Sequence, residues 1–157
     1  MKFSRLAALL FLFAALAQAQ YTAPVTVKNA WVRATVPSQK TTGAFMLLTA
    51  PAGARLVEAR SSAAGMVEIH EMAMVGNVMK MRAVPAVDLP PGKTVELNSG
   101  GYHLMPINLK IQVRAGDSVP LTLIFEGKDK KRQSVEVKAA ARPLNTPAKA
   151  DEHHKGH

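Results

Sequence analysis

Between residues 25 and 140 the chain alternates short apolar stretches with clusters of glycine, proline, asparagine and aspartate. Several stretches show the period of two that half-buried strands have, and β-branched residues recur in them. None sustains a helical period with caps at both ends. The expected strands are 25–35, 43–50, 55–62, 66–75, 78–84, 93–98, 107–113, 119–127 and 132–140. About nine short strands at this spacing predict an all-β fold, an antiparallel Greek-key β-sandwich or barrel.

The N-terminal segment has a different pattern. Lys2 and Arg5 precede an apolar run at 6–16, and the small residues that end at Ala19 fit a cleavage site. The run is shorter than the roughly 20 residues that span a bilayer. We therefore expect residues 1–19 to be a signal peptide that exports the chain and is cleaved after Ala19. No second long apolar segment follows, so no membrane span is expected in the mature chain.

The remainder is expected to form one domain, residues 20–142, followed by a tail. Residues 143–157 contain two prolines, few apolar side chains and mixed charge, which predicts a disordered tail. Its histidines, His153, His154 and His157, are spaced so that a flexible chain could wrap Cu(II) or Zn(II). A polar end without a metal role is the alternative.

The 157 residues contain no cysteine, although the export signal assigns them to an oxidising compartment. Disulfides, thiolate zinc sites, iron–sulfur clusters and blue-copper sites are thereby excluded. The formal net charge is +9, which in a cytosolic protein would favour nucleic-acid binding. Export argues against a nucleic-acid partner. The main basic cluster, 127–132, lies between two expected strands and is interpreted as a solvated hairpin tip, with a docking patch for an acidic partner as the alternative.

Residues 67–81 hold one histidine and four methionines. Gly76-Asn77 predicts a two-residue hairpin turn, because glycine accepts the positive φ that such turns need. The expected cross-strand pairs are Val75–Val78, Met74–Met79, Met72–Met81 and His70–Ala83. Strand alternation then places the histidine and all four methionines on one face. That face is either a packing surface, which is the commoner role of methionine, or a patch of soft metal ligands.

A second histidine is also accompanied by methionine. His103 and Met105 are two residues apart and so share one side of an extended segment. Two glycines precede them, and Pro106, which cannot donate to a ladder, follows. We therefore expect this pair on a loop or at the edge of a sheet. His70 and His103 are the two histidines of the expected domain, and a single shared site explains both.

The spacing of these residues resembles the periplasmic copper chaperones of the PCuAC type, whose signature is His, ten residues, Met, twenty-one residues, then His-x-Met. His70, Met81, His103 and Met105 fit that signature without a gap. Further similar stretches are NAWVRATVP, GAFMLL, VEIHEM and GGYHLM, so the resemblance covers about residues 25–140. It implies a cupredoxin-like fold and a Cu(I) site formed by these four residues.

This donor set suits monovalent copper. Cu(I) is a soft ion that thioether sulfur and imidazole nitrogen bind well, whereas Mg²⁺ and Ca²⁺ prefer oxygen. Thioethers need no deprotonation and form no disulfides, so such a site stays usable after export. Met72, expected opposite Met81, is an alternate ligand or a shield over the site. Glu68 and Glu71 are both candidates to accept the second N–H of a ligating histidine.

The resemblance further implies a periplasmic carrier and not an enzyme. The implied acceptor is the copper-site subunit of cytochrome c oxidase, with a Sco-type thioredoxin-like protein as a partner. Some relatives carry His- or Met-rich C-terminal extensions that bind a second copper, usually Cu(II), and the tail of this chain resembles a short version. A monomer is expected.

Other exported proteins fit the sequence less well. Copper-dependent polysaccharide monooxygenases use an N-terminal histidine, but here the expected mature end is Gln20 and no histidine precedes His70. No nucleophile–base spacing or carboxylate pair indicates a hydrolase. Two alternatives remain. One is a structural or interaction β-sandwich with a packed methionine face, and the other is a CopC-like copper-resistance carrier, which differs in pathway and not in chemistry.

Overall fold

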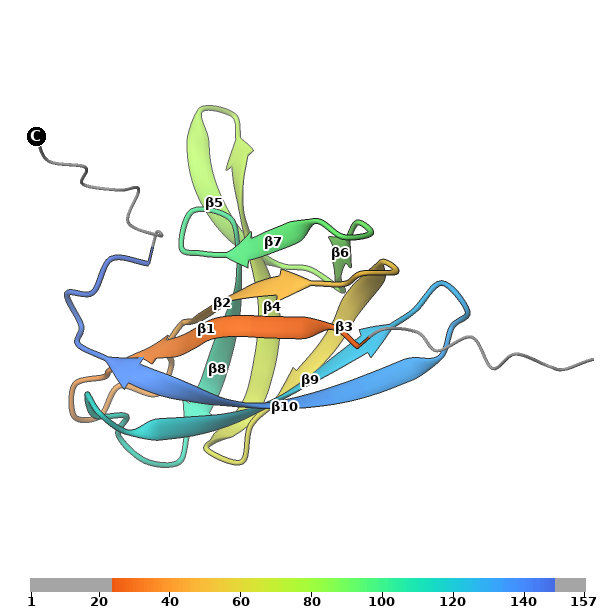
Figure 1. Cartoon of the computed structure of the whole chain (residues 1–157). Coiled ribbons are helices and arrows are strands. Elements are labelled where there is room, and N and C mark those ends of the chain that lie inside the picture. Colours follow the sequence, from red (N-terminus) through yellow and green to blue (C-terminus); the bar gives the residue numbers. More distant parts are fainter. Residues whose placement is uncertain (1–23, 149–157) are drawn as a thin grey trace, which may run out of the picture.

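The structure, a computed structural model, describes residues 24–148 and contains strands but no helix in that range (Figure 1). The strands are β1 (Thr26–Arg33), β2 (Ala44–Thr49), β3 (Ala54–Arg60), β4 (Ala64–Val75), β5 (Val78–Ala83), β6 (Val87–Leu89), β7 (Thr94–Leu97), β8 (Tyr102–Leu109), β9 (Ser118–Glu126) and β10 (Arg132–Arg142). The all-β prediction is confirmed, with ten strands in place of about nine. Within this part of the chain there is no helix long and apolar enough to cross a membrane.

Seven of the strands close into a barrel in the order β4-β8-β2-β1-β10-β9-β3, because β3 and β4 also pair, at Ala59 and Val67. Outside this ring, β5 extends the sheet from β4, β6 pairs with β3, and β7 pairs with β2. The pairs are antiparallel except β1–β10, which runs parallel with Trp31 beside Ala140. The β1–β10 pair is thus an exception to the predicted antiparallel arrangement. β1 and β10 come from opposite ends of the domain, so no hairpin turn fixes their relative direction.

The barrel interior is one apolar cluster, to which the strands contribute alternate side chains. In β9, Leu121, Leu123 and Phe125 are at most 1% exposed, while the residues between them are less buried. β4 and β8 contribute Ile69 and Leu104 to the same cluster. Full burial of one such side chain stabilises a fold by about 1.5–3 kcal/mol. This core, and not any disulfide, therefore stabilises the cysteine-free chain.

Two elements differ from the sequence prediction. β6 is three residues long, which is too short to show a period of two in the sequence. β8 begins at Tyr102 and not at residue 107 as expected. His103 and Met105 therefore lie within the sheet, between β4 and β2, and not on a loop or at an edge as predicted.

Pro106 is compatible with this interior strand because of its position in the ladder. The N–H of Met72 donates to the carbonyl of Gly101 at 3.1 Å, so the even-numbered residues of β4 bond to β8. Pro106 lies opposite Val67, an odd-numbered residue, where no hydrogen bond to β4 is lost. On its other side the Pro106 carbonyl accepts the N–H of Thr42 at 3.1 Å.

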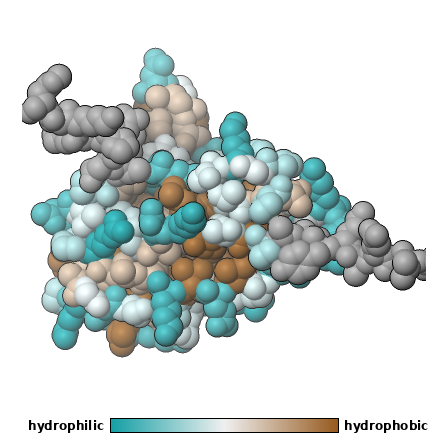
Figure 2. Space-filling view, viewed as in Figure 1, coloured by the Kyte–Doolittle hydropathy of each residue, from teal (hydrophilic) through white to brown (hydrophobic). Residues whose placement is uncertain are grey.

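The hairpin of β4 and β5 projects beyond the barrel (Figure 1). Gly76 and Asn77 have φ values of 50° and 48°, as a type I′ turn requires. All four predicted cross-strand pairs are present, so the predicted register is confirmed. Every residue of β5 is exposed. Figure 2 shows a pale brown surface on this projection below a hydrophilic tip.

The segments at the two ends of β10 differ in packing. Before β10, the basic cluster 127–132 forms the turn that follows β9, as predicted. After β10, the carbonyl of Thr146 accepts a hydrogen bond from Arg33 at 3.4 Å, and most of the expected tail, 143–157, lies outside the described residues. Ala148 is buried with Trp31 and Phe45 in a cluster separate from the barrel core. Two exposed aromatic rings would cost free energy, and this segment covers them.

Candidate metal centre

His70 on β4 and His103 on β8 lie directly opposite each other in the sheet register. Their ring centroids are 5.8 Å apart with an interplanar angle of 64°. Both side chains are buried, with exposures of 8% for His70 and 5% for His103. The fold thus brings together the two histidines that the sequence places far apart.

The histidine pair faces outward from the barrel. The preceding residue on β4, Ile69, pairs with Leu104 on β8, and both point into the core. Because successive side chains of a strand alternate, His70 and His103 lie on the opposite face. Phe45 on β2 stands beside them, with its ring centroid 6.4 Å from that of His103. The histidines are therefore buried in a small environment of their own, outside the main core.

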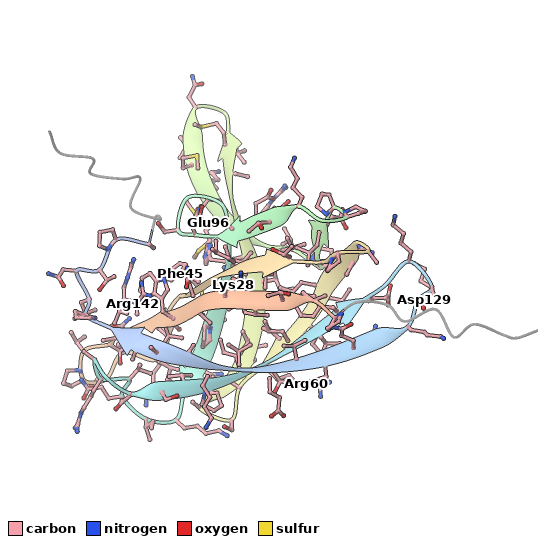
Figure 3. The ribbon with its side chains drawn as sticks, in the orientation of Figure 1. Lys28, Phe45, Arg60, Glu96, Asp129 and Arg142 are labelled. Carbon is pink, nitrogen blue, oxygen red and sulfur yellow. The ribbon has the colours of Figure 1, made fainter. Side chains whose placement is uncertain are left out.

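An aromatic cluster borders this site. Phe45 packs against Trp31, directly opposite on β1, with ring centroids 4.7 Å apart. The guanidinium of Arg33 lies 5.5 Å from the centre of the Phe45 ring, and the guanidinium of Arg142 lies 5.0 Å from the centre of the Trp31 ring. Figure 3 labels Phe45 and Arg142 at this end of the barrel. Gly43 makes room, because a Cβ there would lie 2.6 Å from the Phe45 ring. This cluster is not among the sites predicted from the sequence, although alternation along the two strands could have placed both rings on one face.

The two ring nitrogens of His70 have different surroundings. Nε2 lies 2.6 Å from a carboxylate oxygen of Glu68, and because a carboxylate only accepts, Nε2 carries the proton and donates. Nδ1 is buried and has no hydrogen-bond partner in the described part of the chain. A buried lone pair without a donor is costly, and it is available to a metal ion. Of the two candidate acceptors, the structure selects Glu68, since Glu71 on the other face accepts from Arg82 at 2.8 Å.

In His103 the hydrogen-bonded nitrogen is Nδ1, whereas in His70 it is Nε2. The Nδ1 of His103 lies 3.3 Å from the carbonyl of Gly101 and donates to it, which leaves the lone pair on Nε2. Burial lowers the pKa of His103 below its ordinary value. The Gly101 hydrogen bond opposes that shift, and nearby His70 adds to it. The neutral ring, which is the form that binds metal, therefore persists into mildly acidic solution.

Three methionines border the histidine pair on the same face. Met105 and Met72 each lie two residues from a histidine along their own strand, Met105 on β8 and Met72 on β4. Met81 lies on β5 directly opposite Met72 and is 49% exposed. Methionine has three rotatable side-chain bonds, so each sulfur can turn toward the histidines. Met81 and Met105 lie on the two strands, β5 and β8, that flank β4 on opposite sides.

The charged groups near the site do not form a hard-ion site. No three His, Asp or Glu side chains gather into a metal-binding group anywhere in residues 24–148. Glu68 is engaged by His70. The donors that remain on this face are imidazole nitrogen and thioether sulfur, which soft ions prefer.

Two further predictions cannot be placed in the structure. The candidate second site, His153, His154 and His157, lies outside the described residues, as does the expected signal peptide, 1–19.

Sequence comparison identifies a family and a relative. A family model described as "Putative lipoprotein LpqE-like" matches residues 25–139. "Putative lipoprotein Lxx21020" of Leifsonia xyli subsp. xyli is 32% identical over 102 residues, which cover 64% of this chain and 61% of that protein. The chain therefore spans about three fifths of the length of this relative.

Several solved structures have a similar fold. The Cu(I) form of DR1885 from Deinococcus radiodurans is 28% identical, with a TM-score of 0.60 over 87% of this chain and 89% of that one. Its apo form is 29% identical, with a TM-score of 0.55 over 90% and 95% of the two chains. The copper-bound PCuAC domain from PmoF2 is 22% identical, with a TM-score of 0.62 over 78% of this chain and 95% of that domain. The predicted cupredoxin-like fold is thus confirmed.

Proposed function

The chain belongs to the LpqE-like lipoprotein family, and from that premise we propose that it is an exported copper chaperone whose cargo is Cu(I). The proposed ligands are His70, Met81, His103 and Met105, with Met72 as the alternate sulfur ligand. The protein is proposed to carry the ion without catalysing a reaction.

One observation carries this proposal, namely the pair of buried histidines with complementary hydrogen bonds. In each ring one nitrogen is held by a neighbour, Glu68 for His70 and Gly101 for His103, and the other nitrogen keeps its lone pair. Outer partners of this kind fix the tautomer and orientation of metal-binding histidines. A histidine pair kept only for packing would not need to leave the buried Nδ1 of His70 without a partner.

The similar solved structures support copper as the cargo. The DR1885 structure is named for its bound Cu(I), and that protein is 28% identical to this chain. The neutral donors of this chain match that ion, because thioethers and imidazole bind soft monovalent copper. A chaperone must also release its cargo, and an acceptor with thiolate ligands would provide the stronger soft donors.

Export of the chain is part of the proposal. Both the family and the matched relative are described as lipoproteins, which are exported proteins attached to a membrane. In this chain Lys2 and Arg5 precede the apolar run 6–16, as in a signal peptide. We propose that the chain works in the periplasm after cleavage of residues 1–19.

The proposed destination of the copper is the copper-site subunit of cytochrome c oxidase, with a Sco-type thioredoxin-like protein as partner. Deletion of the gene should lower oxidase activity when copper is limiting, and added copper should restore it. A CopC-like resistance carrier would instead leave the oxidase unaffected and make the strain sensitive to excess copper.

A second, weaker copper site is proposed on the tail, through His153, His154 and His157. Deletion of residues 149–157 should remove one Cu(II) equivalent and leave Cu(I) binding intact. Retention of that Cu(II) equivalent after the deletion would contradict the tail site.

Competition titration with a Cu(I) chelator tests the ligand set. Met81→Ala and Met105→Ala should each lower the Cu(I) affinity by more than about 10-fold. A loss of about that size follows when only a residue hydrogen-bonded to a metal ligand is changed. Met72→Ala and Met79→Ala should lower the affinity less. Equal losses in all four variants would overturn the assignment. Wild-type protein that binds no Cu(I) would favour the alternative, an exported interaction protein with an apolar methionine face.

A further inference from the structure

The projecting hairpin carries more methionine than the proposed Cu(I) site uses. Its methionines form two successive cross-strand pairs, Met72 with Met81 and Met74 with Met79. The first pair borders the histidines, and the second lies next to the Gly76-Asn77 turn. We call the four residues the methionine ladder.

The positions of these four methionines in the β4–β5 pair favour close approach of their sulfur atoms. The N–H of Val84 donates to the carbonyl of Ile69 at 2.8 Å, so odd-numbered residues of β4 exchange hydrogen bonds with β5. The even-numbered positions, Met72 and Met74, are therefore the non-hydrogen-bonded pairs. At such pairs the Cβ atoms lie about 4.5–5.5 Å apart. Two thioether sulfurs can then approach one ion, since metal–sulfur bonds are about 2.3 Å long.

Packing does not explain the outer pair. Met74 is 64% exposed and Met79 is 46% exposed, although methionine in a core would be buried. Both lie on the part of the hairpin that stands away from the barrel (Figure 1). Large apolar side chains exposed together generally indicate a ligand or partner.

The chemistry of this face favours a soft cation. Charged side chains of the hairpin, Lys80 and Arg82, alternate onto the other face, where Arg82 pairs with Glu71. The ladder therefore presents neutral sulfur without an oxygen ligand for Mg²⁺ or Ca²⁺. Two thioethers alone offer fewer donors than the proposed His and Met site, so binding at Met74 and Met79 must be weaker.

We propose that Met74 and Met79 form a second binding site for a soft monovalent cation, through which Cu(I) enters and leaves the histidine site. This inference rests on the proposed function. Transfer along the ladder is ligand exchange: a bond from copper to Met72 or Met81 forms as a bond to Met74 or Met79 breaks. Copper remains monovalent, and no proton or electron moves.

Titration of protein labelled with ¹³C at the methionine methyl groups tests the site, with Ag(I) and Cu(I) as the probes. The first equivalent should shift the methyl signals of Met81 and Met105. A second, weaker equivalent should shift those of Met74 and Met79. Silent Met74 and Met79 signals after tight binding of the first equivalent would overturn this inference alone. Absence of the first binding event would overturn the proposed function, and this inference with it.

A double substitution separates metal binding from an apolar docking surface. Met74→Leu with Met79→Leu keeps the surface apolar but removes both sulfurs. It should keep the tight equivalent, lose the weak one, and slow transfer of Cu(I) to a chelator several-fold. The matched control is Met66→Leu, which changes a methionine on β4 that is as exposed as Met79 (48%) and whose cross-strand partner is Ile107. Transfer at the wild-type rate in the double variant would show that the surface acts only as an apolar contact and would overturn the inference.

Discussion

The two halves of β4 differ in how they are held. In the barrel wall, β4 lies between β5 and β8, and the side chains of Ile69 and His70 are both buried. Beyond Met72 the strand pairs with β5 alone, and Met74 and Val75 are exposed. One strand thus carries a buried nitrogen donor and an exposed sulfur donor. The buried donor suits retention of an ion, and the exposed donor suits its exchange with an acceptor.

The inner face of the wall should govern stability and not metal binding. Leu104→Ala removes a fully buried side chain and should lower the free energy of unfolding by about 2–5 kcal/mol. Urea unfolding of the metal-free protein measures this loss. The Cu(I) affinity of the folded fraction should stay close to that of the wild type. A loss of Cu(I) affinity as large as that of a histidine variant would contradict the assignment of stability to the inner face and metal binding to the outer face.

The outer face should govern metal binding. His103→Ala removes a nitrogen donor and should weaken Cu(I) binding by more than the roughly 10- to 100-fold that outer partners contribute. Chelator competition measures the affinity, and a melting curve verifies that the variant folds. A loss of less than tenfold in folded protein would exclude His103 as a ligand.

The hydrogen bond from His70 to Glu68 should tune the site. Glu68→Gln keeps an acceptor for Nε2 but removes the negative charge, so Cu(I) affinity should fall by about 10-fold. The matched control is Glu71→Gln on the same strand, whose carboxylate faces Arg82 on the other side. Its affinity should equal that of the wild type. If both variants lose affinity equally, the effect is one of net charge.

The smallest expected effect is the pH dependence of stability. The folded-state pKa of His103 lies below the ordinary value near 6.5. The unfolded chain therefore binds the proton first as the pH falls. The stability that the neutral ring contributes is complete above about pH 6.5 and is lost as the pH falls through the folded-state pKa. Melting temperatures of metal-free protein between pH 7.5 and pH 4.5 should show this decline, and His103→Asn should reduce it. An unchanged decline in that variant would assign it to other groups.

The hairpin could be predicted from sequence because its determinants are local. The Gly76-Asn77 turn fixes which residues pair, and the period of two fixes which face they share. The placement of His103 could not be obtained in that way. Pro106 indicates an edge in isolation, and only the register against Val67 makes it compatible with an interior strand.

Long-range packing explains the other differences. The parallel pairing of β1 with β10 depends on closure of the whole barrel, to which no local pattern points. Similarly, Ala148 is buried against the rings of Trp31 and Phe45, which come from distant strands, so the composition of residues 143–148 does not predict this contact. The choice between Glu68 and Glu71 needs no long-range contact, because strand alternation places Glu68 on the face of His70 and Glu71 on the other face, where it accepts from Arg82.

X-ray absorption at the copper edge, on protein loaded with one equivalent of Cu(I), tests the central claim most directly. The claim predicts two nitrogen neighbours at about 2.0 Å and two sulfur neighbours at about 2.3 Å, close to the lengths of zinc–imidazole and zinc–thiolate bonds. A first shell of nitrogen and oxygen without sulfur, or of sulfur without nitrogen, would contradict it.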